Sequence, residues 1–190
     1  MILTFERPIV YHLAPSITVY DEHNNVVAYI ERKAFKAYEE IIGYTNKDKT
    51  TIIFTSKAET INDIAGKYSI FTAANEPVGA IQKDLGAQIK TWRSHVLILD
   101  REGNQVGEMV EKRFVDVKTN QDQIDTMLHG RSIVTYRGEQ VGVMRTPLSK
   151  VFAGLIKLKK VFCVEYTDTN TMPKELQLAL PGIIGVLPVR

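Results

Sequence analysis

The sequence predicts a mainly β protein with minor α structure, in which repeated hairpins form a closed or nearly closed antiparallel sheet. Three observations predict this fold class: a strand–turn–strand pattern that occurs four times, Asn or Gly at each turn, and an apolar carboxyl-terminal segment that needs a covering surface. A chain of 190 residues can bury a sizeable core without disulfides or metals. We expect residues 1–190 to form one domain.

Four segments share one template, in which a valine is followed by a small residue. The four pairs are Val27-Ala28, Val78-Gly79, Val106-Gly107 and Val141-Gly142. An apolar residue stands seven positions before each valine and another three positions after it. The small residue indicates close packing where a larger side chain would collide, as in a strongly curved strand. Any one copy fits an ordinary hairpin, but the four together favour true repetition.

The turn of each copy lies three residues before the valine, at Asn24, Asn75, Gly103 or Gly138. These residue types tolerate positive φ, as short hairpin turns require. The copies are unequally spaced, which fits a closed antiparallel sheet better than a solenoid. Further strands are expected at 51–55, 88–92 and 114–117, and closure would remove exposed sheet edges.

Helices are expected in three places. Residues 119–130 have capping residues at the start and Gly130 as a stop, and residues 34–43 have apolar side chains at helical spacing. A third helix should start at Pro173, followed by an apolar tail that contains Pro181 and Pro188. This carboxyl end is expected to pack into the interior of the sheet.

The repeats and the apolar carboxyl end together resemble the tubby C-terminal-like superfamily, which includes LURP-one-related proteins, phospholipid scramblases and small bacterial relatives. The segments that carry the resemblance are 17–33, 68–83, 95–112, 132–145 and 174–187. The resemblance implies a barrel of about twelve antiparallel strands around a buried apolar helix. Pro181 departs from this pattern, because proline breaks a long helix and only a short or kinked one would fit. The chain also lacks a polybasic or calcium-binding run like those of the better-studied members.

Charge and cysteine content restrict the class of protein. The net charge is +2 with acids and bases interspersed, which argues against a dedicated nucleic-acid binder. Cys163 is the only cysteine, so no intrachain disulfide can form. The first residues show no secretory signal, and no window is long and apolar enough to be transmembrane. We therefore expect a cytoplasmic protein.

Catalytic and metal-binding signatures are not recognisable. His12, His23, His95 and His129 are scattered, and none stands at metal-ligand spacing from another His or from the cysteine. The sequence contains no phosphate loop, dinucleotide fingerprint or nucleophile elbow. We expect no catalytic residues, no metal and no cofactor.

The strongest candidate for a functional site is basic and comprises Arg145, Lys150, Lys157, Lys159 and Lys160. If residues 156–161 form a strand, Lys157 and Lys159 project from one face. This arrangement could present ammonium groups to phosphate. The alternative is a solvated outer face, with lysines guarding a sheet edge.

Three hypotheses for function follow. The first is a non-enzymatic binding domain that engages anionic phospholipid head groups or another phosphate-bearing ligand through this basic surface, which would place it at the membrane periphery. The second is a protein-interaction or regulatory scaffold without a small ligand. An enzyme ranks last, because no residue constellation supports it.

Overall fold

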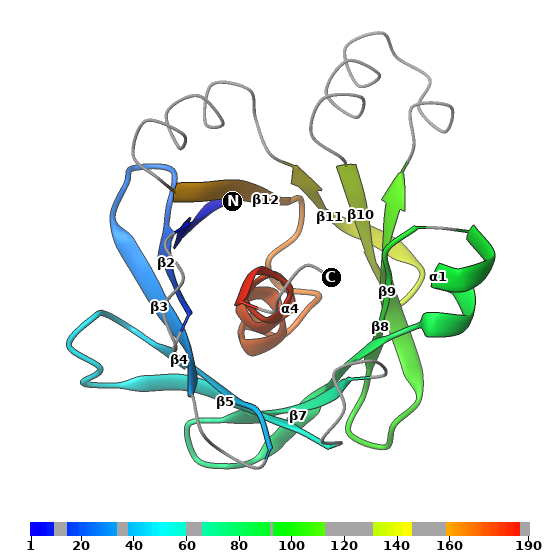
Figure 1. The fold of residues 1–190 in the computed structure, drawn as a ribbon, viewed down its shortest axis with the longest axis horizontal. Helices are drawn as coiled ribbons and strands as arrows, with labels where there is room; N and C mark the ends of the chain where they lie inside the picture. The colour runs from blue at the N-terminus through cyan, green and yellow to red at the C-terminus, as the bar shows by residue number, and fades with distance from the viewer. Residues whose placement is uncertain are drawn as a thin grey trace, which may run out of the picture.

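Twelve antiparallel strands close into a barrel whose interior holds the carboxyl-terminal helix (Figure 1). The computed structural model describes residues 1–9, 15–33, 38–59, 66–91, 93–112, 131–145 and 159–186. Each strand pairs with its neighbours in the chain, and β1 pairs with β12 to close the barrel. The strands are β1 (Ile2–Pro8), β2 (Ser16–Tyr20), β3 (Val26–Lys33), β4 (Glu40–Tyr44), β5 (Ile52–Ala58), β6 (Lys67–Thr72), β7 (Pro77–Lys83), β8 (His95–Leu99), β9 (Gln105–Lys112), β10 (Arg131–Tyr136), β11 (Glu139–Arg145) and β12 (Lys159–Tyr166). The predicted fold class is confirmed.

The valine of the repeated template is the extra residue of a β-bulge. In the hairpin of β2 and β3, Val19 pairs with Ala28 and Tyr20 pairs with Val26, which leaves Val27 without a partner. The same shift in register leaves Val78, Val106 and Val141 as the extra residues of the other three copies. Bulges increase local twist and curvature, so each copy helps the sheet to close.

The small residue after the valine leaves room for the next strand, as the sequence predicts. A Cβ on Gly79 or Gly107 would lie closer than 3.0 Å to a backbone carbonyl oxygen, that of Leu99 on β8 or of Thr135 on β10. The predicted turn residues Asn24, Asn75, Gly103 and Gly138 all have positive φ. The turn residues are therefore confirmed in all four copies, and the close packing at the small residue is confirmed at Gly79 and Gly107.

A fifth copy, in the hairpin of β4 and β5, is absent from the sequence prediction. Here Ile53 is the bulged residue, and the large Phe54 stands where the other copies have a small residue. The small residue is instead Gly43 on the opposite strand, where the Phe54 ring takes the space of a Cβ. The positive φ of this hairpin is at Lys49, which is neither Asn nor Gly.

Two secondary-structure predictions are wrong. Residues 88–91, predicted as strand, belong to helix α1 (Leu85–Thr91), which begins where the Asp84 Oδ1 accepts a hydrogen bond from the Ala87 amide at 3.0 Å. Residues 40–43, predicted as helix, lie in β4, because pairing with β3 and β5 overrides local preference. Residues 34–37, the predicted helix 119–130 and the predicted strand 114–117 lie outside the described residues, as do Trp92 and His129.

Helix α4 (Lys174–Val186) fills the barrel (Figure 1). Its side chains are buried on all sides, as expected for a helix enclosed by a core. Glycines let it approach the wall: a Cβ on Gly182 would meet the Ile30 side chain at 2.6 Å, and one on Gly185 would meet the Phe162 ring at 2.9 Å. The apolar carboxyl end therefore packs inside the sheet, as predicted.

Pro181 lies within α4, and the barrel wall compensates for it. A proline has no amide hydrogen, so the carbonyl of Gln177, four residues earlier, lacks its helical donor. The Tyr166 hydroxyl donates a hydrogen bond to this carbonyl at 2.6 Å. Complete burial raises the pKa of Tyr166, which keeps the hydroxyl protonated and able to donate. The side-chain amide of Gln177 donates to the carbonyls of Thr169 and Met172, which ties the preceding loop to the helix.

Replacing Tyr166 with Phe should leave the buried Gln177 carbonyl without a donor. We expect a loss of about 1–3 kcal/mol in the free energy of unfolding, measured by urea denaturation at pH 7. In a Pro181→Ala background, the new amide of residue 181 can donate to this carbonyl, so the same substitution should cost less. Tyr38→Phe, at an exposed ring, serves as the control and should change little. Equal losses in the two backgrounds would contradict this account.

The same variant has an expected pH dependence. The raised pKa of Tyr166 means that the unfolded chain loses this proton above about pH 10 while the folded chain retains it. The contribution of Tyr166 to stability is therefore fully present below that pH and falls above it, by about 1.4 kcal/mol per pH unit. The stability difference between wild type and Tyr166→Phe should narrow between pH 9 and pH 11. A constant difference would show that the Tyr166 hydroxyl is not buried.

Candidate functional site

The two ends of the barrel differ in their connections. At one end, here the turn end, the hairpins close through residues 21–25, 45–51, 73–76, 100–104 and 137–138. At the other, here the loop end, the odd-numbered strands and α4 finish. The Arg7 guanidinium there donates to the carbonyl of Gly185 at 2.7 Å, so a cation stabilises the carboxyl terminus of the helix.

The loop end carries a basic residue on every odd-numbered strand, as its last or next-to-last residue. These six residues, here the basic ring, are Arg7, Lys33, Lys57, Lys83, Lys112 and Arg145. Odd and even strands alternate around the closed barrel, so the members of the ring lie two strands apart. Five members end the second strand of a bulged hairpin and so follow from the hairpin repeat, and Arg7 on β1 completes the ring.

Of the predicted basic cluster, the structure describes Arg145, Lys159 and Lys160, whereas Lys150 and Lys157 lie outside the described residues. Arg145 forms an ion pair with Glu165 at 3.1 Å, and Lys159 forms one with Glu6 at 2.7 Å. The hydrogen bond to Glu6 raises the pKa of Lys159. Only Lys160, which is exposed, lacks an acidic partner among the described residues.

Several acidic side chains on the strands and at the loop end are held by basic partners. The Glu31 carboxylate, only 8% exposed, pairs with Lys33 and with Lys49, the latter at 2.5 Å. Burial alone would raise the pKa of Glu31, but the hydrogen bonds from the two lysines lower it overall. Glu59 pairs with Lys67 at 3.1 Å.

Five lysines at the loop end form no ion pair with an acid within the described part of the chain. They are Lys57, Lys83, Lys90 on α1, Lys112 and Lys160. Lys57, Lys90 and Lys160 are exposed, and the other two are half-buried. These ammonium groups are available to an external anion, whereas the acids around them are already paired.

Sequence reasoning missed Lys57, Lys83 and Lys112 because they are far apart in the chain. The available signal was a basic residue four to six positions after each bulged residue, from Ile53 to Lys57 and from Val106 to Lys112. The predicted cluster was compact in sequence, but two of its described members form ion pairs. Arg145 pairs with Glu165, and Lys159 pairs with Glu6.

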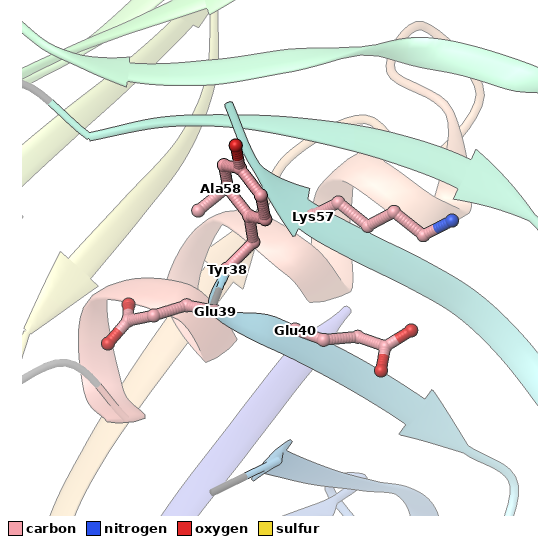
Figure 2. Close-up of a pocket in the computed structure, with 5 residues that line it drawn as sticks. All are labelled: Tyr38, Glu39, Glu40, Lys57 and Ala58. Atoms are coloured by element: carbon pink, nitrogen blue, oxygen red, sulfur yellow. The ribbon is translucent and has the colours of Figure 1, made fainter. Parts of the chain in front are cut away.

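An open pocket of about 320 Å³ lies at the loop end between β4 and β5, lined by Tyr38, Glu39, Glu40, Lys57 and Ala58. Figure 2 shows the Glu39 and Glu40 side chains pointing in opposite directions, whereas Glu40 and Lys57 point the same way. Glu39 is held by Arg32 and by the Tyr68 hydroxyl, at 2.6 Å from the latter. The two carboxylates therefore do not face one reacting atom as a general acid and base would.

His95 lies beside α1 with a carboxylate at each ring nitrogen. Its Nδ1 is 3.2 Å from Asp84 Oδ2 and its Nε2 is 2.8 Å from Glu108 Oε2. These contacts occupy both nitrogens with different carboxylates, and Asp84 also caps α1. The arrangement fastens α1 to the outside of β8 and β9 (Figure 1).

Metal-ligand clusters and bilayer-spanning helices are absent from the described ranges. Among those residues, no three His, Cys, Asp or Glu side chains gather as a metal ion would require. No described helix has the length and apolar character to span a bilayer. Pairing of β1 with β12 leaves no open edge among the twelve described strands.

Comparison of the chain with models of known families, with curated proteins and with solved structures gave no match. The resemblance to the tubby C-terminal-like superfamily therefore stays a prediction. The class that the structure defines is a closed, twelve-stranded antiparallel barrel around its own carboxyl-terminal helix.

Proposed function

We propose that the protein is a non-enzymatic binding domain that engages phosphate groups, on anionic phospholipid head groups or on another phosphate-bearing ligand, through its basic loop end. The observation that carries the proposal is the basic ring, in which lysines without acidic partners stand beside acids that are already paired. Helix α4 occupies the interior of the barrel, which favours an external binding surface.

The opposite end of the barrel has a different charge. Acidic residues outnumber basic ones in its five turns, which contain Asp21, Glu22, Lys47, Asp48, Lys49, Glu76, Asp100, Arg101, Glu102 and Arg137. A protein with a basic and an acidic end should approach an anionic surface basic end first. We propose that the domain acts at the periphery of a cytoplasmic membrane, with its loop end toward the lipid.

Neutralising two loop-end lysines should weaken binding to acidic vesicles. Near an anionic membrane each lysine contributes about 1 kcal/mol, so Lys57→Gln with Lys160→Gln should lower the affinity about 30-fold. The measurement is cosedimentation with phosphatidylserine-containing vesicles at low salt, repeated at high salt, where wild-type binding should fall.

The matched control is Lys47→Gln with Lys174→Gln, which removes the same charge from exposed lysines at the turn end. It should bind as the wild type does. Equal losses for the two double variants would indicate a net-charge effect without a defined surface. Absence of wild-type binding at low salt would overturn the proposal.

A further inference from the structure

The three most exposed large apolar side chains of the described residues all lie at the loop end. Ile9 follows β1 and is 50% exposed, Tyr38 precedes β4 and is 51% exposed, and Ile89 on α1 is 73% exposed. The large apolar side chains exposed at the turn end, Met1, Ile2, Val26 and Ile52, are less exposed, at 37–47%. The loop end therefore combines the most exposed apolar groups with the basic ring.

These three side chains are distributed around the barrel. Three strand steps separate β1 from β4, four separate β4 from β8 beside α1, and the remaining five return to β1. Ile9, Tyr38 and Ile89 thus belong to three different sides of the loop end, and members of the basic ring lie on strands between them. Basic residues interspersed with exposed apolar side chains are typical of protein surfaces that lie in a membrane interface.

We infer that the loop end docks on an anionic bilayer with Ile9, Tyr38 and Ile89 inserted at the level of the head groups. This inference rests on the proposed function and specifies its partner as a membrane, in place of a soluble phosphate-bearing ligand. The lysines supply a salt-sensitive attraction, and the inserted side chains supply an apolar contribution that salt does not screen.

Ile89 offers the cleanest test, because its exposure makes the fold tolerant of substitution. Ile89→Ser should weaken binding to phosphatidylserine-containing vesicles about tenfold while leaving its salt dependence unchanged. The matched control, Val26→Ser, removes an apolar side chain that is 42% exposed at the turn end and should bind as the wild type does. Thermal unfolding of both variants checks that the fold is intact.

A second measurement reads insertion directly. An environment-sensitive fluorophore on Ile89→Cys should shift to shorter wavelength when acidic vesicles are added, and the same fluorophore on Val26→Cys should not. The buried Cys163 is protected from the labelling reagent in the folded protein. An unshifted probe at position 89 on vesicle-bound protein would overturn the inference.

The possible failures are distinguishable. If Ile89→Ser binds as tightly as the wild type while Lys57→Gln with Lys160→Gln binds more weakly, charge alone holds the protein and only the insertion inference fails. If inorganic phosphate or a soluble head group at millimolar concentration abolishes vesicle binding, the ligand is a phosphate group and not the bilayer. If the wild type does not bind acidic vesicles at all, the proposed function fails with the inference.

Discussion

A chain that ends before Lys174 is expected not to fold. Helix α4 contributes Leu176, Leu178, Leu180, Ile183 and Val186 to the core, each at most 3% exposed. Burying one such side chain contributes about 1.5–3 kcal/mol, so the five together approach the whole stability of a typical domain, about 5–15 kcal/mol. The truncated chain should show no cooperative urea transition and should bind the dye ANS.

Point variants in the full-length chain measure how much single residues of α4 contribute to stability. Leu180→Ala should lower the free energy of unfolding by about 2–5 kcal/mol, because it opens a cavity between helix and barrel. Lys174→Ala, at the exposed start of the helix, should change stability little. A truncated chain that unfolds cooperatively with the wild-type midpoint would show that the barrel does not need its helix.

Gly107→Ala is expected to cost more stability than the same exchange at a turn glycine whose Cβ position is open. The new Cβ would meet the carbonyl oxygen of Thr135, a backbone atom held in the pairing of β9 and β10. The sheet can relieve this contact only by shifting a strand, and such overpacking costs about 1–3 kcal/mol or more. Urea denaturation measures the loss.

Substitutions at two other glycines separate backbone strain from steric collision as causes of the lost stability. Gly103 has a φ of +87° with nothing near its Cβ position, so Gly103→Ala tests backbone strain without collision and should cost about 1 kcal/mol. Gly86 is an exposed helical position, where alanine should be neutral or stabilising by up to about 1 kcal/mol. If Gly107→Ala costs no more than Gly103→Ala, the close approach of β10 is not what requires the glycine.

The hairpins were predictable because their signal is local. A turn residue with positive φ, a bulged valine and a small neighbour lie within a few residues of one another, and Asn24 and Gly103 fill the turn position as predicted. The fifth hairpin was not predicted because its small residue lies on the other strand. The large Phe54 follows the bulged residue, and Gly43, which pairs with Phe54 across the hairpin, makes room for its ring.

Tertiary pairing explains the other differences. The sequence around Ile41 and Ile42 suits a helix as well as a strand, and pairing with β3 and β5 selects the strand. The basic cluster was predicted from residues that are close in sequence. Which basic side chains remain without an ion pair at the loop end depends instead on the acidic residues that the folded barrel places beside them. Lys159 forms an ion pair with Glu6 from the other end of the chain, whereas Lys57 and Lys112 form no ion pair with an acid among the described residues.

The account depends on α4 lying inside the barrel, and nuclear Overhauser effects test this most directly. With the Cβ position of Gly182 2.6 Å from Ile30 Cδ1, the α-protons of Gly182 should show strong effects to the Ile30 δ-methyl group. Those of Gly185 should show effects to the Phe162 ring. Absence of both, with α4 amides exchanging freely with solvent, would contradict a barrel built around its own carboxyl-terminal helix.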